Sequence, residues 1–489
     1  MTLGTVLSIK EKPSTLEYYF VSANPVFKNQ FVVVDSGGSK TIGTVVEVSR
    51  FNRYFESPEV MRRSQERVLS RLPANEWELE IARVRVYGVL ENDVIRRPCQ
   101  AISPGSSVRV AGVEELNTFM GFDSNGLLLG TMEHHDVPVK INLNRALQKH
   151  VAVLAMSGAG KSYSVSVLIE ELLDRDKARP AVVVLDVHGE YKGFAQDANY
   201  NERTKVYEKV KIPVSSLSVS DYSLFMPGMS EAQKRELGGV ITQLRTRQST
   251  GKGPYDLSDV INAVEQEVKG GTAAALKSWL EQLAATGLFD KTGNISVSDL
   301  AQPGKLSVIN LANETNLYKK QVLGAWVSRN LFWARRDNQV PPFVLLVEEA
   351  HNFAGNQSHS ISRGIIETIA REGRKFGASL CLVSQRPVRL STTALSQCNT
   401  QLILRVTNPY DLKHIGESSE GIDDATLQSI TTLRVGEGIL VGEAVNFPLF
   451  LKIRERKSKE GSLGKDFEQA ALDYEKKDDQ KRSDAGAFM

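Results

Sequence analysis

A phosphate-binding loop is the strongest chemical signal in the sequence. Residues Ala155–Ser162, AMSGAGKS, lie between an apolar stretch, Val151–Leu154, and a segment of helical spacing, Lys161–Asp174. In such a strand–loop–helix unit the backbone N–H groups surround phosphate oxygens, Lys161 adds positive charge near the β- and γ-phosphates, and Ser162 offers Mg²⁺ a hydroxyl ligand. The residues expected to bind the nucleotide are Ser157, Gly158, Ala159, Gly160, Lys161 and Ser162. The sequence therefore predicts a site for ATP and Mg²⁺, although the loop begins with Ala155 where a glycine is expected.

Two acidic residues follow a second apolar stretch. Glu348 and Glu349 come directly after Phe343–Val347. A nucleotide hydrolase needs a carboxylate near the metal and a base for the attacking water. We expect Glu348 to support the metal shell through its waters and Glu349 to polarise the water. The alternative, a solvated acidic strand end, is disfavoured because the same chain carries the Lys161 motif.

Polar residues also end two further apolar stretches. Gln385 follows Ser379–Ser384, and Asp186 ends Ala181–Asp186. Ligands of open α/β sheets bind at the carboxyl ends of the strands. Gln385 is therefore a candidate γ-phosphate sensor, with a plain turn residue as the alternative. Asp186 is a candidate for nucleotide binding, by positioning water or metal, and turn formation or capping explains it equally well.

Two other clusters permit more than one interpretation. The basic segment Ala370–Phe376 ends a helical pattern, where cations offset the helix dipole. Alternatively, Arg374 reaches the γ-phosphate of a neighbouring subunit and stabilises transition-state charge. His134, His135 and Asp136 have no second ligand cluster in the sequence, which favours a hairpin surface over a metal site.

Strands that alternate with helices position these residues. Apolar strands buried on both faces are typical of a parallel sheet. Beyond those already named, we expect a strand at Leu306–Leu311, a strand at Gln401–Val406, and helices at Leu317–Arg335 and Ser360–Phe376. The predicted fold class is α/β, a RecA-like P-loop ATPase core.

Other regions flank or interrupt that core. Short β-rich segments from Gly4 to Met132 predict a small N-terminal β-barrel, interrupted by a helical pattern at Ser57–Leu72. Only helical patterning is found at about 218–289, which indicates a helical insertion. The expected domains are 1–135 for the barrel, 136–455 for the ATPase core with its insertion, and 456–489 for a charged tail.

The composition limits the class of protein. Hydrophobic residues make up 41% and charged residues 24%, as in a soluble enzyme. With 60 Lys and Arg against 58 Asp and Glu, the net charge of +2 does not indicate nucleic-acid binding, so any DNA-binding surface must be local. Cys99, Cys381 and Cys398 lack metal or disulfide spacing. With no apolar run of about 20 residues, we expect a cytoplasmic protein that makes no membrane contact.

With these motifs in place, the chain resembles the HerA family of archaeal and bacterial DNA translocases, relatives of the FtsK pumping ATPases. The resemblance spans nearly the whole chain. The blocks that carry it are Ala155–Ser162, Asp186–Tyr191, Val347–His351, Ile369–Gly377, Val383–Pro387, Leu395–Asn399 and Glu417–Ser419.

The resemblance implies roles and partners. It implies a homo-hexamer with DNA in its central pore, a barrel that aids ring assembly and contacts a nuclease, and a tail that braces a neighbouring subunit. It makes Glu349 the catalytic carboxylate, Gln385 a nucleotide sensor and Arg374 a phosphate contact. Relatives often have Arg-His where this chain has Lys149-His150, so Lys149 is a second candidate for the basic residue that acts in trans. Asn356–Ser360 is a candidate pore segment.

The predicted function is an ATP-driven DNA translocase or helicase that feeds DNA ends to a NurA-type nuclease in double-strand break repair. An alternative keeps the motor but pairs it with another effector enzyme in antiviral defence. A third, a scaffold that binds ATP without hydrolysing it, is disfavoured because such a scaffold has no need of Glu349.

Overall fold

The computed structural model describes residues 2–8, 12–52, 78–356, 360–419, 421–461, 468–469 and 471–476. The predicted helix at Ser57–Leu72 and residues 357–359 of the candidate pore segment lie outside these ranges. The chain forms two compact units. The first contains Met1–Glu171 and Ser384–Glu455, and the second contains Leu172–Val383 and Arg456–Met489. Within the described ranges, no helix combines the length and apolar character needed to cross a bilayer.

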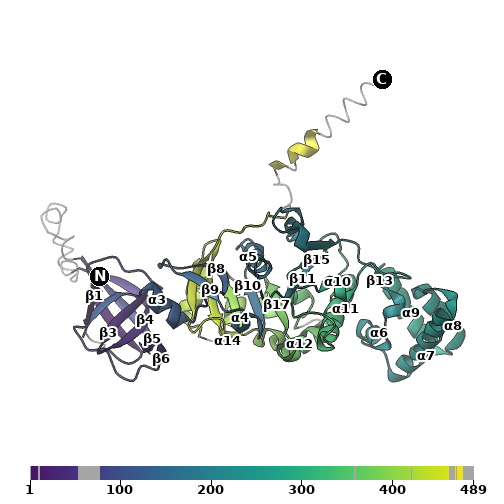
Figure 1. Cartoon of the computed structure of the whole chain (residues 1–489), viewed down its shortest axis with the longest axis horizontal. Helices are drawn as coiled ribbons and strands as arrows, with labels where there is room; N and C mark the ends of the chain where they lie inside the picture. The colour runs from purple at the N-terminus through teal and green to yellow at the C-terminus, as the bar shows by residue number, and fades with distance from the viewer. Residues whose placement is uncertain are drawn as a thin grey trace. The chain divides into compact units, whose positions relative to one another are not determined.

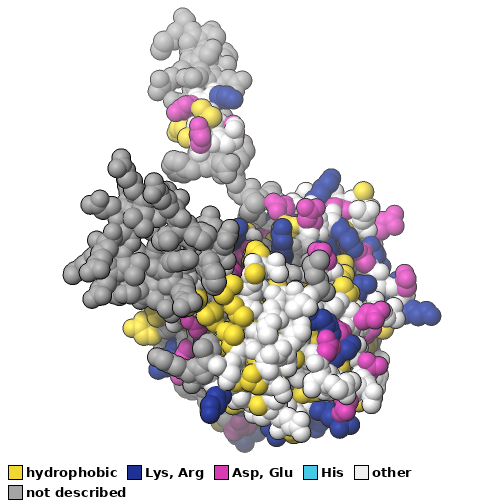
Figure 2. All heavy atoms as spheres, turned by 90° about the vertical axis from the view of Figure 1, so that its left-hand side faces the viewer, with side chains coloured by type: hydrophobic (Ala, Val, Ile, Leu, Met, Phe, Trp, Pro, Cys, Tyr) yellow, Lys and Arg dark blue, Asp and Glu magenta, His cyan; other side chains and the backbone are white. Residues whose placement is uncertain are grey.

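The first unit begins with a closed barrel, several strands of which are labelled in Figure 1. Its six strands are β1 (Thr2–Leu7), β2 (Glu17–Ser22), β3 (Phe31–Ser36), β4 (Ser39–Asn52), β5 (Glu78–Glu91) and β7 (Ser107–Val110). The barrel closes because β2 pairs with both β1 and β5, while β6 (Val94–Arg96) extends β5 on the outside. Alternate residues point inward, so Tyr18, Phe20, Val32 and Val84 fill the interior. On the part of the barrel end visible in Figure 2, acidic and basic side chains are interspersed.

A second sheet in the first unit carries the phosphate loop. β10 (Val151–Leu154) pairs in parallel with β18 (Thr400–Ile403), and helix α5 (Lys161–Leu173) follows β10. Antiparallel strands then continue from β18 in the order β19 (Glu437–Gly442), β20 (Leu449–Ile453), β8 (Leu127–Met132) and β9 (Pro138–Ile141).

The junction between barrel and core lies earlier in the structure than the predicted boundary after residue 135. The last barrel strand, β7, ends at Val110, and helix α3 (Val113–Met120) follows it. β8, predicted as part of the barrel region, pairs with β20 of the core sheet. The β2–β5 pairing closes the ring of barrel strands. The closed ring therefore has no free strand edge with which β8 could pair.

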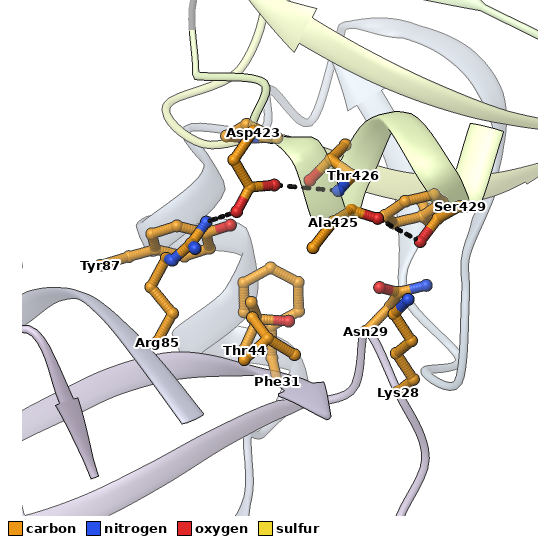
Figure 3. A pocket seen from close by; sticks show the side chains of 13 residues that line it. Lys28, Asn29, Phe31, Thr44, Arg85, Tyr87, Asp423, Ala425, Thr426 and Ser429 are labelled. Carbon is orange, nitrogen blue, oxygen red and sulfur yellow. Dashed lines mark hydrogen bonds and ion pairs between the residues drawn. The ribbon is translucent and has the colours of Figure 1, made fainter. Parts of the chain in front are cut away.

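Specific contacts dock the barrel onto this sheet within the first unit. Arg85 of β5 forms an ion pair with Asp423, at 2.5 Å, next to helix α15 (Asp424–Thr432), as Figure 3 shows. The ring of Phe447 stacks on Tyr87 and on Phe119, with centroids 5.0 and 4.5 Å apart. The barrel therefore reaches the core through both charged and aromatic contacts.

The second unit contains five parallel strands that lie side by side. Their order is β12 (Thr204–Tyr207), β15 (Leu306–Asn310), β11 (Ala181–Asp186), β16 (Phe343–Val347) and β17 (Ala378–Ser384). Every residue of β11, β15, β16 and β17 is buried, as the apolar runs predict. Helices α11 (Leu317–Arg336) and α12 (Arg363–Glu372) lie between strands in the sequence.

Residues 218–289 of the second unit contain the helices that their pattern predicts. They are α6 (Val219–Phe225), α7 (Glu231–Arg247), α8 (Leu257–Glu267) and α9 (Gly271–Ala285). Ser218, Ser230 and Asp256 each begin a helix with a capping box, which satisfies the free amides of its first turn. The two ends of the segment meet, because β13 (Ile212–Pro213) pairs with β14 (Phe289–Asp290).

Candidate active site

The phosphate loop lies at the carboxyl end of β10 and is anchored by its neighbours in the first unit. The Ala155 N–H donates to the Ser384 carbonyl at 3.2 Å, and the Met156 N–H donates to the Arg405 carbonyl at 2.9 Å. The loop therefore starts beside Gln385, which is half-buried. The structure brings Gln385 and the beginning of the predicted nucleotide loop together.

The backbone of the loop explains its residue types. Gly158 and Gly160 have φ of +75° and +89°, in the left-handed region that favours glycine. Ala155 is absent from the described residues with positive φ, so alanine fits where the motif usually has glycine. Lys161, the first residue of α5, is only 6% exposed. The N–H groups at this helix start, the helix dipole and the Lys161 charge together make an anion site.

Asp186 and Glu348 hold a loop in the second unit. The Asp186 carboxylate accepts hydrogen bonds from the N–H groups of Gly189, Glu190 and Tyr191 at 2.7–3.1 Å. Glu348 Oε2 accepts from the N–H groups of residues 187 and 188 at 2.8 and 3.1 Å. Burial raises the pKa of Asp186 even though these hydrogen bonds oppose the shift. Both carboxylates therefore fix residues 187–191, and for Asp186 the geometry favours the turn-forming interpretation.

Glu349 is directed to different partners from its neighbour. Its φ of +47° places it in the left-handed region, and it is only 5% exposed. His188 Nε2 lies 3.6 Å from Glu349 Oε1, and His351 Nδ1 lies 3.3 Å from Oε2. Neither histidine was predicted as a site residue. Their position in the sequence could have indicated a role, because each follows the carboxyl end of an apolar strand.

The donor set fits a metal that arrives with the nucleotide. In the described ranges, no group of three or more His, Cys, Asp and Glu side chains is arranged to hold a metal ion. Mg²⁺ keeps several waters and takes oxygen ligands from phosphates, so a single hydroxyl such as that of Ser162, at the start of α5, suits it. Glu348 Oε2 is engaged by the amides of residues 187 and 188.

The two basic candidates lie in different units. Arg374 is exposed in the 3-10 turn η8 (Gly373–Lys375) of the second unit. Lys149, in the first unit, forms an ion pair with Glu443 at 2.5 Å. Lys149 lies before the start of β10, and the phosphate loop lies after the end of this strand. The length of β10, at about 3.3 Å per residue, therefore separates Lys149 from the loop of its own chain.

A strand, phosphate loop and helix, together with carboxylates at the ends of parallel strands, define a P-loop ATPase. A family model described as the central domain of helicase HerA matches residues 127–331. The chain is 26% identical to a probable helicase of Methanocaldococcus jannaschii, over 93% of this chain and 96% of the relative. It is also 26% identical to the DNA double-strand break repair helicase HerA of Sulfolobus acidocaldarius, over 93% of each chain. These matches confirm the resemblance of the chain to the HerA family of helicases.

Solved structures share the fold. VirB4 of Thermoanaerobacter pseudethanolicus matches with a TM-score of 0.54 and 14% identity, over 68% of this chain and 98% of that chain. The bacterial conjugative coupling protein TrwB matches with a TM-score of 0.50 and 11% identity, over 73% and 94%. These likenesses support the predicted α/β P-loop ATPase fold.

Proposed function

We propose that this protein is an ATP-driven DNA translocase or helicase that acts as a homo-hexamer with a nuclease in the repair of double-strand breaks. One observation carries the proposal: a phosphate loop with Lys161 and a buried carboxylate at Glu349 occur in a chain that matches HerA repair helicases along more than nine-tenths of its length. The nuclease, of the NurA type, and the passage of DNA through a ring pore follow from the family resemblance.

The phosphate loop, Glu349 and Gln385 each have a task in the proposed ATP hydrolysis. The loop N–H groups and Lys161 bind the phosphates, and Ser162 would hold Mg²⁺, which when bound offsets charge on the β- and γ-phosphates. Glu349 orients the attacking water and takes its proton. Gln385, anchored beside the loop start, responds to the γ-phosphate.

A basic residue from a neighbouring subunit completes the proposed site. Such a cation stabilises the charge that develops as the γ-phosphate is transferred. Arg374 is exposed and offers a guanidinium, whereas Lys149 would first have to leave Glu443. These observations favour Arg374 over Lys149 as the residue that acts in trans.

The ATPase rate with and without linear double-stranded DNA tests the proposal. We expect DNA to stimulate the wild-type rate, Lys161→Ala to abolish nucleotide binding, and Glu349→Gln to keep binding but lose about 100-fold or more in turnover. Glu372→Gln, an exposed glutamate at the end of α12, is the matched control and should turn over normally. Equal rates in all four proteins would refute the site. A wild-type rate indifferent to DNA would refute the DNA motor and favour an ATPase controlled by a partner enzyme.

A further inference from the structure

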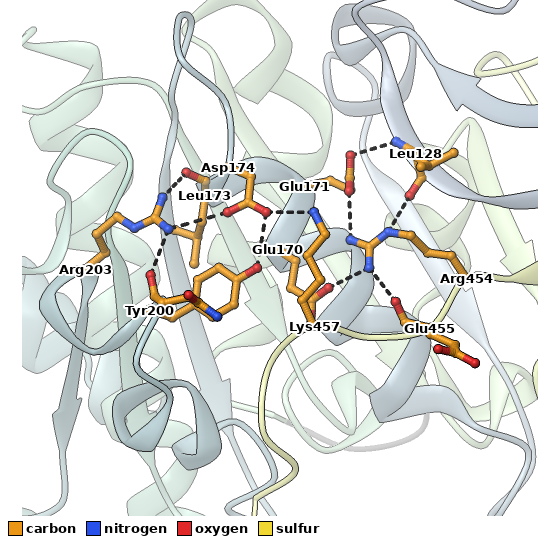
Figure 4. A network of polar contacts seen from close by, with 11 residues as sticks. Leu128, Glu170, Glu171, Leu173, Asp174, Tyr200, Arg203, Arg454, Glu455 and Lys457 are labelled. Carbon is orange, nitrogen blue, oxygen red and sulfur yellow. Dashed lines mark hydrogen bonds and ion pairs between the residues drawn. The ribbon is translucent and has the colours of Figure 1, made fainter.

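Ion pairs hold the residues that directly follow the last strand, β20. In the first unit, Arg454 is 12% exposed and pairs with Glu170 and Glu171 of α5, at 2.8 and 2.7 Å (Figure 4). In the second unit, Lys457 pairs with Asp174 at 2.9 Å (Figure 4). We call residues 456–461, which include Lys457, the C-terminal strap.

The strap is built into the second unit. The Lys459 N–H donates to Asp197 Oδ2 at 3.0 Å, and Ser458 is only 5% exposed. Arg456 donates to Ser458 Oγ at 3.0 Å and to the Lys459 carbonyl at 2.8 Å, which fixes the course of the strap itself. The charged residues at the start of the predicted tail are thus partly buried.

Two glycines allow the strap to pack backbone against backbone. A Cβ atom added to Gly193, in the 3-10 turn η3 (Lys192–Gln196), would lie 2.2 Å from the Lys459 carbonyl oxygen. One added to Gly461 would lie 2.5 Å from the Glu190 oxygen and 3.0 Å from the Gly189 oxygen. The 2.2 and 2.5 Å separations are shorter than real Cβ contacts, so a side chain at either glycine would push the strap away.

The strap ends on the loop that faces the proposed catalytic carboxylate. Residues 187–191 are the loop fixed by Asp186 and Glu348, and His188 in this loop lies 3.6 Å from Glu349. The His188 side chain is 48% exposed, so its place depends on the loop backbone more than on packing around the ring.

We propose that the C-terminal strap positions Glu349 for ATP hydrolysis, by holding residues 187–191 so that His188 stays against the carboxylate. Gly461 and His188 are positioning residues in this proposal, since both act through Glu349. The proposal rests on the ATPase function proposed above.

The test is a comparison of kcat and KM in the full-length protein. Gly461→Leu places a side chain where the Glu190 carbonyl lies and should lower kcat about tenfold or more through misplacement of Glu349, with KM for ATP within twofold of wild type. Asp197→Ala removes the acceptor of the Lys459 N–H and should act in the same direction, which keeps the test decisive if Gly461→Leu misfolds. Gly239→Leu, at an exposed helical glycine with open space around it, is the matched control.

A double variant separates positioning from a general loss of structure. If the strap acts through His188, then Gly461→Leu should lower kcat no further once His188→Ala is present. Trypsin should also cleave after Arg456 and Lys457 faster in Gly461→Leu than in wild type. Unchanged kcat in both strap variants, a raised KM with unchanged kcat, or full additivity with His188→Ala would overturn the proposal. A wild-type protein that hydrolyses no ATP would instead refute the proposed function.

Discussion

At the scale of single residues, the adjacent Glu348 and Glu349 have different roles, because the backbone turns between them and directs their side chains to different partners. Glu348 is fully buried and accepts loop amides, whereas Glu349, in a left-handed conformation, faces two histidines. A non-glycine residue in this region costs on the order of 1 kcal/mol or more, and such residues cluster at functional sites. The strain at Glu349 therefore supports its assignment as the catalytic carboxylate.

The structural role of Glu348 predicts that its replacement lowers the stability of the protein. Glu348→Ala removes the acceptor of two buried N–H groups, and we expect the free energy of unfolding to fall by about 1–3 kcal/mol. Denaturant unfolding measures this, with Glu372→Ala, at an exposed glutamate, as the control. If both variants lose the same small amount, Glu348 does not hold the loop.

Residues within a contiguous motif could be predicted from the sequence, whereas contacts between distant segments could not. The phosphate loop is contiguous, so its motif predicts Lys161 and Ser162 without knowledge of the fold. His188 meets Glu349 only because β11 pairs with β16, with Leu185 opposite Val347, whereas His351 follows Glu349 in the same turn. No spacing rule connects residues brought together by that pairing. The ion pair of Lys149 with Glu443 is equally long-range and was not predicted.

At the scale of elements, strands buried on both faces were the easiest to predict. β10, β11 and β16 are continuous apolar runs, and their predicted limits match the structure. The edge strand β12 and the antiparallel strand β20 were not predicted, because they mix exposed and buried positions in short stretches. β8 was recognised as a β-segment and assigned to the barrel, since a sequence pattern does not specify the partner of a strand.

The turn between β8 and β9 predicts a pH-dependent stability. His135 Nε2 accepts the Phe31 N–H of the barrel at 3.0 Å, and burial lowers the pKa of His135 to about 4. The fold thus favours the neutral ring. Its contribution is complete above the unfolded pKa of about 6.5 and is lost as the pH falls toward 4, up to about 3 kcal/mol in total.

Thermal unfolding at pH 7.5 and pH 5.0 checks this expectation. Wild type should lose more stability between these values than His135→Gln, because the amide oxygen can accept the Phe31 N–H but does not titrate in this range. An equal loss in the two proteins would assign the acid sensitivity to other groups. The structural role of His135 also explains why the His-His-Asp motif need not be a metal site.

At the scale of the whole molecule, the proposed DNA translocase must bind DNA although the chain as a whole is not strongly basic. The net charge is +2, and acidic and basic side chains are interspersed on the visible barrel end (Figure 2). Contacts to phosphates from a few local cations are sufficient, because each contact releases condensed counterions. Such contacts give no information on base sequence. A translocase requires this property, since it must bind every position along the DNA equally well.

The consequence is a binding reaction that depends on salt and not on sequence. We expect the Glu349→Gln protein with ATP to bind two linear duplexes of equal length and different sequence with affinities within about twofold. The logarithm of the affinity should fall linearly with the logarithm of salt concentration, with a slope of about −0.9 for each phosphate contacted. Fluorescence anisotropy between 50 and 200 mM salt, a range that the same relation makes informative, measures both quantities. A strong preference for one duplex, or an affinity indifferent to salt, would mean that this chain reads bases or binds DNA through a partner, and neither behaviour suits a ring that moves along DNA.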